Sequence, residues 1–210
     1  RSSSDEAISD IAAADTDYQS VDVANEEVLT SASHRINSSN YRNYFNPKSG
    51  DLISSSVNAG DTIEIDGSFN GRAFVFRTPV NVVGTSTNSM KNCIFTFYEG
   101  GSGSTVSNLK IVNTKDYAYG VFLNGASKCV IHDCFINNTG QSSYTICVAN
   151  NANYNNVSNN VLSAYGKTYG HSTRSTPPLL LCNAHYNEIG NNDISCDDAN
   201  GIYLSSYEGG

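Results

Sequence analysis

A short repeat of β-forming residues is the feature that most constrains how this chain can fold. Segments 120–139, 145–165 and 178–198 align: each begins with an apolar triplet and continues, eight or nine residues later, with two apolar residues five positions apart. An earlier copy begins at 95, and a further copy, cut off, begins at 202. From the end of one triplet to the next, the steps are 26, 25, 33 and 23 residues, a spacing of β-rich units that is typical of a solenoid.

Apolar residues alternate with a period of two within each unit, so the segments are predicted to be strands rather than helical turns. Each unit holds three such segments, separated by corners rich in Asn, Gly and Ser. A coil of three short strands per turn is a right-handed parallel β-helix, an all-β fold in which the inward residues of successive turns stack into columns. Two core columns are predicted: Phe97, Leu123, Val148, Leu181 and Leu204 in one, and Val106, Ile131, Val157 and Ile189 in the other.

The corners between the strands carry two further expectations. The step of 33 residues contains an insertion at 164–178, which must leave the coil as a loop. Asn160 and Asn192 stand at equivalent corners, where earlier turns have Leu109 and Cys134. Stacked asparagines can hydrogen-bond up and down a coil, so we predict an amide ladder at this corner. The alternative is that these residues serve only the turns.

The net charge of −8 is distributed unevenly along the 210 residues. Eight acidic residues and a single basic one precede residue 28, whereas the remainder holds 12 acidic and 11 basic residues. We therefore predict an acidic, flexible spacer at 1–33 and one β-helix domain at 34–210, with its cap and first turns at 34–90 and regular turns at 91–210. Because the last turn stops part-way, the chain is expected to be a fragment of a longer protein.

Charge and cysteine usage exclude several partners. The nearly neutral domain has no basic face for nucleic acid, and no apolar run is long enough to span a membrane.

Six cysteines, at 93, 129, 134, 147, 182 and 196, occupy positions that predict small apolar fillers at independent sites. Alternation points His132 away from Cys134, so the Cys129, His132 and Cys134 group is not expected to bind a metal. No cofactor is predicted.

Several motifs resemble the start of adhesin-like proteins of methanogenic archaea, which are large secreted or wall-bound β-helix proteins. The motifs are YRNYFNPKSGDL from Tyr41, GDTI from Gly60, DGSFNG from Asp66, PVNV from Pro79, NEIGNNDI from Asn187 and GIYL from Gly201. The resemblance covers nearly the whole chain. It implies a location at the cell surface, a binding or structural role, and no defined catalytic residues.

Enzymes with this fold need clustered carboxylates on an outer face. The outward middle positions of the triplets form instead an apolar strip without a carboxylate pair: Thr96, Phe122, Cys147, Leu180 and Tyr203. Such a strip commonly marks a contact surface, and we expect self-association through it. The weak catalytic candidates are Asp197 and Asp198, with His171 and Arg174 in the inserted loop.

Tyrosines gather just ahead of the strand triplets, at one predicted corner. They are Tyr117, Tyr119, Tyr144, Tyr165, Tyr169 and Tyr203. Aromatic faces beside Asn, Ser and Thr are suited to holding sugars; alternatively, the rings only cover the outer strands. Sequons at Asn37, Asn137 and Asn156 predict glycosylation, with Asn137 expected at an exposed corner.

Three functions remain open from the sequence. The first is an extracellular, adhesin-like protein that binds a surface glycan or protein without catalysis. The second is a polysaccharide lyase or glycoside hydrolase whose cleft uses the loop at 165–178. The third is an architectural subunit of a cell wall or filament.

Overall fold

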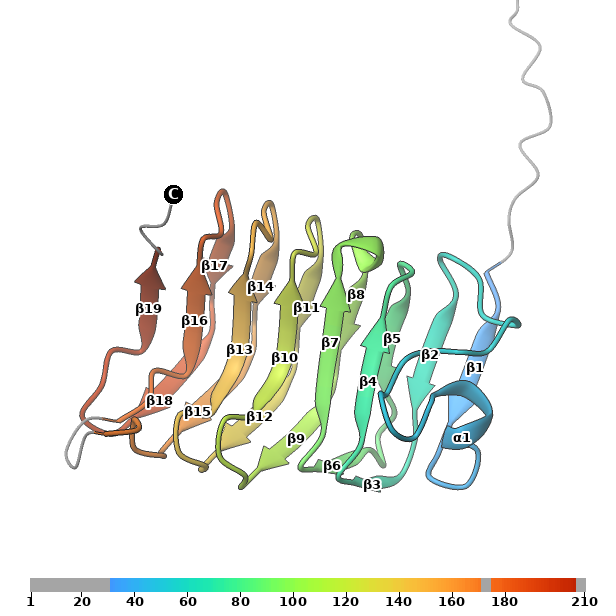
Figure 1. The fold of residues 1–210 in the computed structure, drawn as a ribbon, viewed down its shortest axis with the longest axis horizontal. Coiled ribbons are helices and arrows are strands. Elements are labelled where there is room, and N and C mark those ends of the chain that lie inside the picture. Colours follow the sequence, from blue (N-terminus) through green and yellow to red (C-terminus); the bar gives the residue numbers. More distant parts are fainter. Residues whose placement is uncertain (1–30, 171–174, 207–210) are drawn as a thin grey trace, which may run out of the picture. The chain divides into compact units, whose positions relative to one another are not determined.

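The structure is a computed structural model that describes residues 31–170 and 175–206. Three parallel sheets wind into a right-handed β-helix of about 7 turns with almost no helix, as the repeat predicted (Figure 1). The first strand begins at Ser33, one residue before the predicted start of the β-helix domain. Most of the predicted spacer, residues 1–30, lies outside the described residues.

The first turn contributes only β1, and each later turn contributes one strand to each sheet. Sheet 1 consists of β1 (Ser33–Ile36), β2 (Thr62–Ile65), β5 (Asn81–Gly84), β8 (Thr105–Ser107), β11 (Val130–His132), β14 (Asn156–Ser158) and β17 (Glu188–Gly190). Sheet 2 consists of β3 (Ser68–Asn70), β6 (Ser89–Lys91), β9 (Lys110–Asn113), β12 (Phe135–Asn138), β15 (Val161–Ala164) and β18 (Asp193–Cys196). Sheet 3 consists of β4 (Ala73–Phe76), β7 (Ile94–Tyr98), β10 (Tyr119–Asn124), β13 (Tyr144–Ala149), β16 (Leu179–Cys182) and β19 (Ile202–Ser205).

The strand register confirms both predicted core columns. In sheet 3, Leu123 lies opposite Phe97 on one side and Val148 on the other, and Leu181 lies opposite Leu204. The column from Val106 to Ile189 runs through sheet 1. Sheet 2 supplies a third column, consisting of Phe69, Met90, Ile111, Ile136, Leu162 and Ile194.

Buried amides form the predicted ladder at the corner between sheets 1 and 2. Asn160 accepts the backbone N–H of Cys134 at 2.9 Å and donates to the Ile131 carbonyl at 3.0 Å, and its own backbone N–H donates to Asn192 Oδ1 at 3.0 Å. A second ladder, which the sequence did not indicate, joins Asn155 to Asn187 between sheets 3 and 1. Each ladder accepts a backbone N–H at a corner outside the strands, that of Cys134 in the first and that of Cys129 in the second.

A left-handed residue makes the corner between sheets 1 and 2 sharp enough for a compact coil. Asn108, Asp133, Asn159 and Asn191 occupy this position in successive turns, with φ between 54° and 57°. Asn and Asp tolerate this conformation better than other residues that carry a side chain. The corner side chains therefore project from the coil at regular intervals.

The N-terminal end of the core is covered by a short segment containing α1 (Tyr41–Tyr44). The rings of Tyr41 and Phe45 lie 5.4 Å and 5.1 Å from that of Phe74, which itself stacks on Phe95 at 4.4 Å. A 3-10 turn, Glu99–Gly101, follows β7. The segment around α1 is the cap expected within 34–90.

All six cysteines are free. Burial raises the pKa of the Cys134 and Cys147 thiols to about 12, so both stay protonated at neutral pH. In the described part of the chain, His, Cys, Asp and Glu side chains do not gather in threes as a metal site would require. The same residues include no helix with the length and apolarity needed to cross a membrane.

Candidate functional site

The predicted tyrosine corner lies where the chain passes from sheet 2 to sheet 3. Tyr119 and Tyr144 occupy the same register position at the start of β10 and β13, and their rings stack 6.1 Å apart. The Tyr119 ring also stacks on Phe122 at 4.7 Å. These two tyrosines therefore lie along the outer surface of sheet 3, with rings from successive turns in contact.

Tyr117 and Tyr169 form a second pair, on the loop that precedes β10 and on the inserted loop that precedes β16. Their ring centroids are 6.2 Å apart, and the side chains are 59% and 68% exposed. The loops stack through backbone contacts: Tyr117 N–H donates to the Gln141 carbonyl, and Tyr169 N–H donates to Ser142 Oγ. The pair is the most open part of the tyrosine corner.

Tyr165 does not join the other tyrosines, contrary to the sequence-based prediction. Its hydroxyl lies 3.1 Å from Ser195 Oγ in β18, on the outer face of sheet 2. The residue follows the last strand of sheet 2 before the inserted loop, so its ring turns towards the sheet that the chain has just left. The position of Tyr165 close to the corner in the sequence therefore did not predict the direction of its ring.

A hollow of about 150 Å³ opens beside Tyr144 and Tyr203, between the inserted loop and the segment before β19. The loop is held by Thr176 N–H to the Gly166 carbonyl at 2.9 Å and by Lys167 Nζ to Ser175 Oγ at 3.3 Å. The residues that line the hollow are Tyr144, Thr168, Ser175, Pro177, Ala199, Asn200 and Tyr203. Two aromatic side chains, an amide and two hydroxyls thus surround a space without a carboxylate, histidine, lysine or arginine among its described lining.

The polar loop residues of the hollow were missed at the sequence level. Thr168, Ser175 and Asn200 are ordinary loop residues in composition, and no spacing distinguishes them. Another missed feature is an exposed pair of stacked rings, Tyr154 and Tyr186, at 5.0 Å on the corner between sheets 3 and 1. Each directly precedes an asparagine of the second amide ladder, which is the signal that could have identified the pair.

Of the weak catalytic candidates, only Asp197 and Asp198 lie among the described residues. Asp197 and Asp198 are exposed and immediately precede Ala199 and Asn200 of the hollow, but neither lines it. His171 and Arg174 lie outside the described residues.

The outward column on sheet 3 has the predicted register, with Phe122, Cys147, Leu180 and Tyr203 on successive strands. The open apolar strip expected here is not found, because Cys147 is only 2% exposed and Phe122 and Leu180 are half-buried. Cys147 packs with Ala149, Cys182 and the ring of Tyr119 on the outside of the coil. Tyr203, at 41%, is the most exposed of these four side chains.

The three sequons differ in their surroundings. Asn37 lies in the turn between β1 and α1, where its Oδ1 accepts the backbone N–H groups of Ser39 and Asn40. Asn137 lies within β12 rather than at an exposed corner, and it is half-buried. Asn156 begins β14 and is half-buried. The exposed corner expected for Asn137 is therefore wrong, because β12 continues through Asn138 and the next corner follows the strand.

Comparison with known proteins finds no matching family model, curated protein or solved structure.

Proposed function

We propose that this β-helix is a non-catalytic, adhesin-like protein that binds a glycan at the tyrosine corner. The observation that carries the proposal is the hollow between Tyr144 and Tyr203, with Ser175 and Asn200 on its wall. Aromatic rings offer apolar faces to the C–H groups of a sugar, while hydroxyl and amide groups fix its orientation. No acid or base lines this space among the described residues, so it is suited to holding a ligand rather than to cleaving one.

The size of the hollow limits the ligand. Sites for drug-sized molecules measure roughly 300–1,000 Å³, and this hollow holds about 150 Å³. We therefore propose that it takes a single sugar ring, at the end or at a branch of a longer glycan. The exposed pair of Tyr117 and Tyr169 lies on the same corner and would contact the neighbouring part of that glycan.

The proposed location is outside the cell, at its surface or wall, as for the adhesin-like proteins of methanogenic archaea that the sequence resembles. Of the three sequons, Asn37 is the best placed for modification, because it lies in a turn rather than in a strand. Asn137 and Asn156 lie in half-buried strand positions, which an oligosaccharide-transferring enzyme reaches less easily.

One observation keeps a lyase or hydrolase as the second candidate. Asp197 and Asp198 adjoin two residues of the hollow, and a sugar bound there would lie near their carboxylates. Release of oligosaccharides from a polysaccharide panel, lost in an Asp197→Asn, Asp198→Asn variant, would favour this candidate over the non-catalytic one.

The test of the first candidate is binding of the full chain to a glycan array, followed by titration with the best-bound oligosaccharide. Tyr203→Ala and Asn200→Ala are each expected to weaken binding by about tenfold or more, because each removes a contact to the sugar. Tyr165→Ala is the matched control, since it removes an exposed tyrosine outside the hollow and should leave binding unchanged. Equal binding by all four proteins would reject the hollow as the site.

A further inference from the structure

The outer face of sheet 2 carries a row of exposed side chains with an ordered pattern of charge. Lys110, Phe135, Val161 and Asp193 occupy the same register position on β9, β12, β15 and β18. Phe135 and Val161 are 43% and 42% exposed, and both charged residues are exposed. Along the coil the row therefore reads positive, apolar, apolar, negative.

A second row runs beside the first, two residues further along each strand. On β9, β12, β15 and β18 it consists of Val112, Asn137, Ser163 and Ser195, and the exposed Lys91 on β6 precedes Val112. Val112 is 39% exposed, so the two rows form one patch with three exposed apolar side chains. In the described structure Asn137 Oδ1 is buried without a hydrogen-bond partner, so the exposed surface of the patch rests on the apolar and charged side chains.

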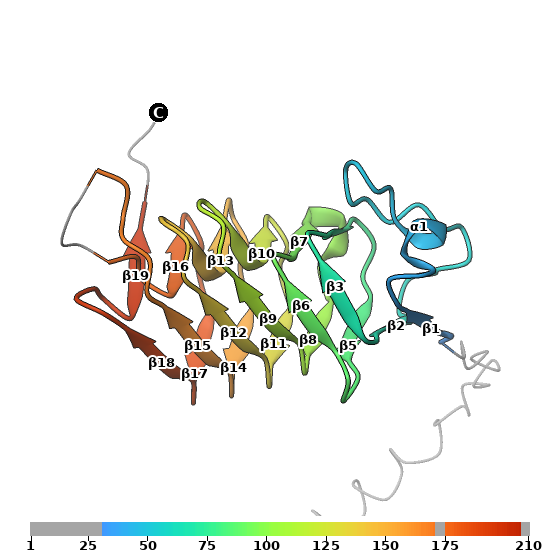
Figure 2. The ribbon, with the colours of Figure 1, turned by 90° about the horizontal axis from the view of Figure 1, so that it is seen from below.

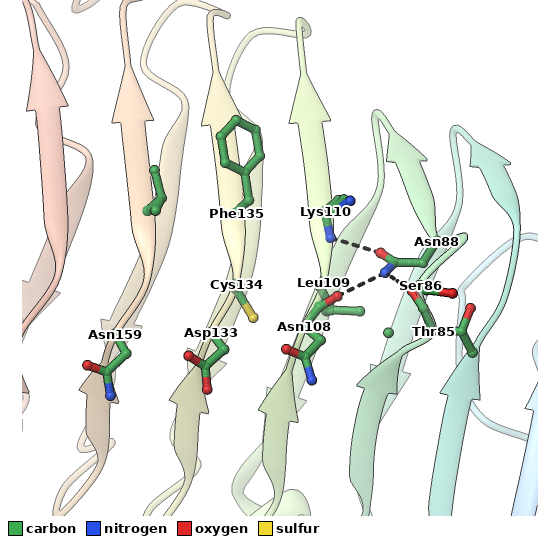
Figure 3. Close-up of a pocket in the computed structure, with 12 residues that line it drawn as sticks. Thr85, Ser86, Asn88, Asn108, Leu109, Lys110, Asp133, Cys134, Phe135 and Asn159 are labelled. Atoms are coloured by element: carbon green, nitrogen blue, oxygen red, sulfur yellow. Dashed lines mark hydrogen bonds between the residues drawn. The ribbon is translucent and has the colours of Figure 1, made fainter.

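A shallow groove of about 550 Å³ borders the first row on its corner side. Figure 3 shows the corner side chains of Asn108, Asp133 and Asn159 in line along the coil, with Lys110 and Phe135 projecting from the neighbouring strands. The Asn88 amide accepts Lys110 N–H at 2.8 Å and donates to the Asn108 carbonyl at 2.9 Å, which fixes the backbone beneath the row. These two hydrogen bonds hold the backbone that carries the Lys110 end of the row.

The pattern of charges favours one orientation for a second copy of the chain against this patch. If two copies meet through this face with their coil axes antiparallel, Lys110 of each lies opposite Asp193 of the other, and Phe135 lies opposite Val161. With parallel axes, Lys110 would instead face Lys110 and Asp193 would face Asp193. Opposite charges across an interface favour the first arrangement, and like charges disfavour the second.

We propose that the outer face of sheet 2 pairs with the same face of a second copy of this chain, around a twofold axis that runs parallel to the strands. Such an axis makes the contact self-complementary, as a closed dimer requires. The interface thus differs from the strip on sheet 3 expected from the sequence.

The size of the patch predicts a weak dimer. Four strands spaced about 4.8 Å apart give a row about 14 Å long, and the second row lies only two residues away along the strands. The area of such a patch is well below the roughly 800 Å² per partner of a stable interface. Association is therefore expected only at high protein concentration, or where many copies share one surface. Lining residues of the hollow at Tyr144 and Tyr203 are not part of the patch, so a dimer would present two glycan sites and gain avidity.

This inference does not depend on the proposed glycan binding, because sedimentation needs no glycan. The experiment is sedimentation equilibrium of the full chain over a wide concentration range. Lys110→Glu and Asp193→Lys should each weaken dimerisation by about tenfold or more, and the double variant Lys110→Glu, Asp193→Lys should restore it. Lys48→Glu, which reverses an exposed charge in the cap, is the control and should behave like the parent.

The double variant distinguishes the two orientations. With parallel axes it would bring the two introduced glutamates against each other and the two introduced lysines against each other, and dimerisation would stay weak. Failure of the double variant to restore association overturns the antiparallel arrangement, and a parent chain that stays monomeric at all concentrations overturns the interface itself. All substituted side chains are exposed, so thermal melts should show that each variant folds like the parent.

Discussion

Leu180 and Leu181 are neighbours in β16 that face opposite sides of the coil. Leu181 is 6% exposed and lies in the core column between Val148 and Leu204, whereas Leu180 is half-buried and packs on the outside against the Cys147 cluster. We expect Leu181→Ala to lower the free energy of unfolding by about 2–5 kcal/mol through lost burial and a cavity. Leu180→Ala should cost clearly less. Urea denaturation of both variants checks this, and equal losses would contradict the assigned register.

Asn160 tests the amide ladder at the scale of one side chain. It is 1% exposed, and its replacement by Ala would leave the Cys134 N–H without the Asn160 acceptor and would remove a hydrogen bond to the Ile131 carbonyl. An unpaired buried group costs about 1–3 kcal/mol and a lost hydrogen bond about 0.5–1.5 kcal/mol, so we expect Asn160→Ala to destabilise the chain by about 1.5–4.5 kcal/mol. Asn192→Ala is the matched comparison, since Asn192 is half-buried and water can replace part of its bonds. Melting of both variants at the same temperature as the parent would contradict a stabilising role for the ladder.

At the scale of elements, the residues that face the core could be predicted from the sequence, whereas the packing of the outward-facing side chains could not. The columns and the Asn160 corner follow from alternation and from equal spacing, because a stacked core admits only one register. The direction of Tyr165 and the covered state of Cys147 depend on which neighbouring side chains lean over them, and no period in the sequence records that. The hollow at Tyr144 and Tyr203 likewise arises from the path of an inserted loop, for which the sequence indicated only a departure from the coil.

The first turns carry two carboxylates whose ionisation should govern the acid stability of the N-terminal part. Hydrogen bonds from Thr87, Arg35 and Thr85 lower the pKa of Asp66 from the ordinary 3.8 to about 2. The pKa of Asp61 is also lowered, by the backbone N–H of Asn58, by His34 and by the backbone N–H of Ala32. Because the unfolded chain takes up these protons more readily, both carboxylates stabilise the fold above pH of about 4, and this contribution is lost as the pH falls towards 2.

Thermal melts at a series of pH values between 7 and 2 measure this effect. The melting temperature should fall most steeply below pH of about 4, and Asp66→Asn should lower it at neutral pH while flattening the acid limb. Asp193→Asn, on the exposed face of sheet 2, should leave the shape of the profile unchanged. An Asp66→Asn profile parallel to that of the parent would show that these hydrogen bonds do not control acid stability.

At the scale of the whole molecule, the core column is less buried at β19 than in the middle turns. Figure 2 shows the turns stacked in chain order, with β19 at one end of the coil. Phe97 and Leu123 in the middle turns are fully buried, whereas Leu204, in the same column on β19, is 72% exposed. In a solenoid each turn contacts only its neighbours, so stability is approximately a sum of local terms rather than one global value. Local opening should therefore be easiest where the core column is least covered.

Hydrogen exchange under native conditions tests this gradient directly. We expect backbone amides of β10 and β13 to exchange at least about 100-fold more slowly than those of β19, with β16 between them, because opening the last described turn exposes little additional apolar surface. Leu123→Ala should raise exchange in β7, β10 and β13 together, since these strands share its column. Uniform protection across β7 to β19 would contradict the prediction, because it would mean that the coil opens only as a single cooperative unit.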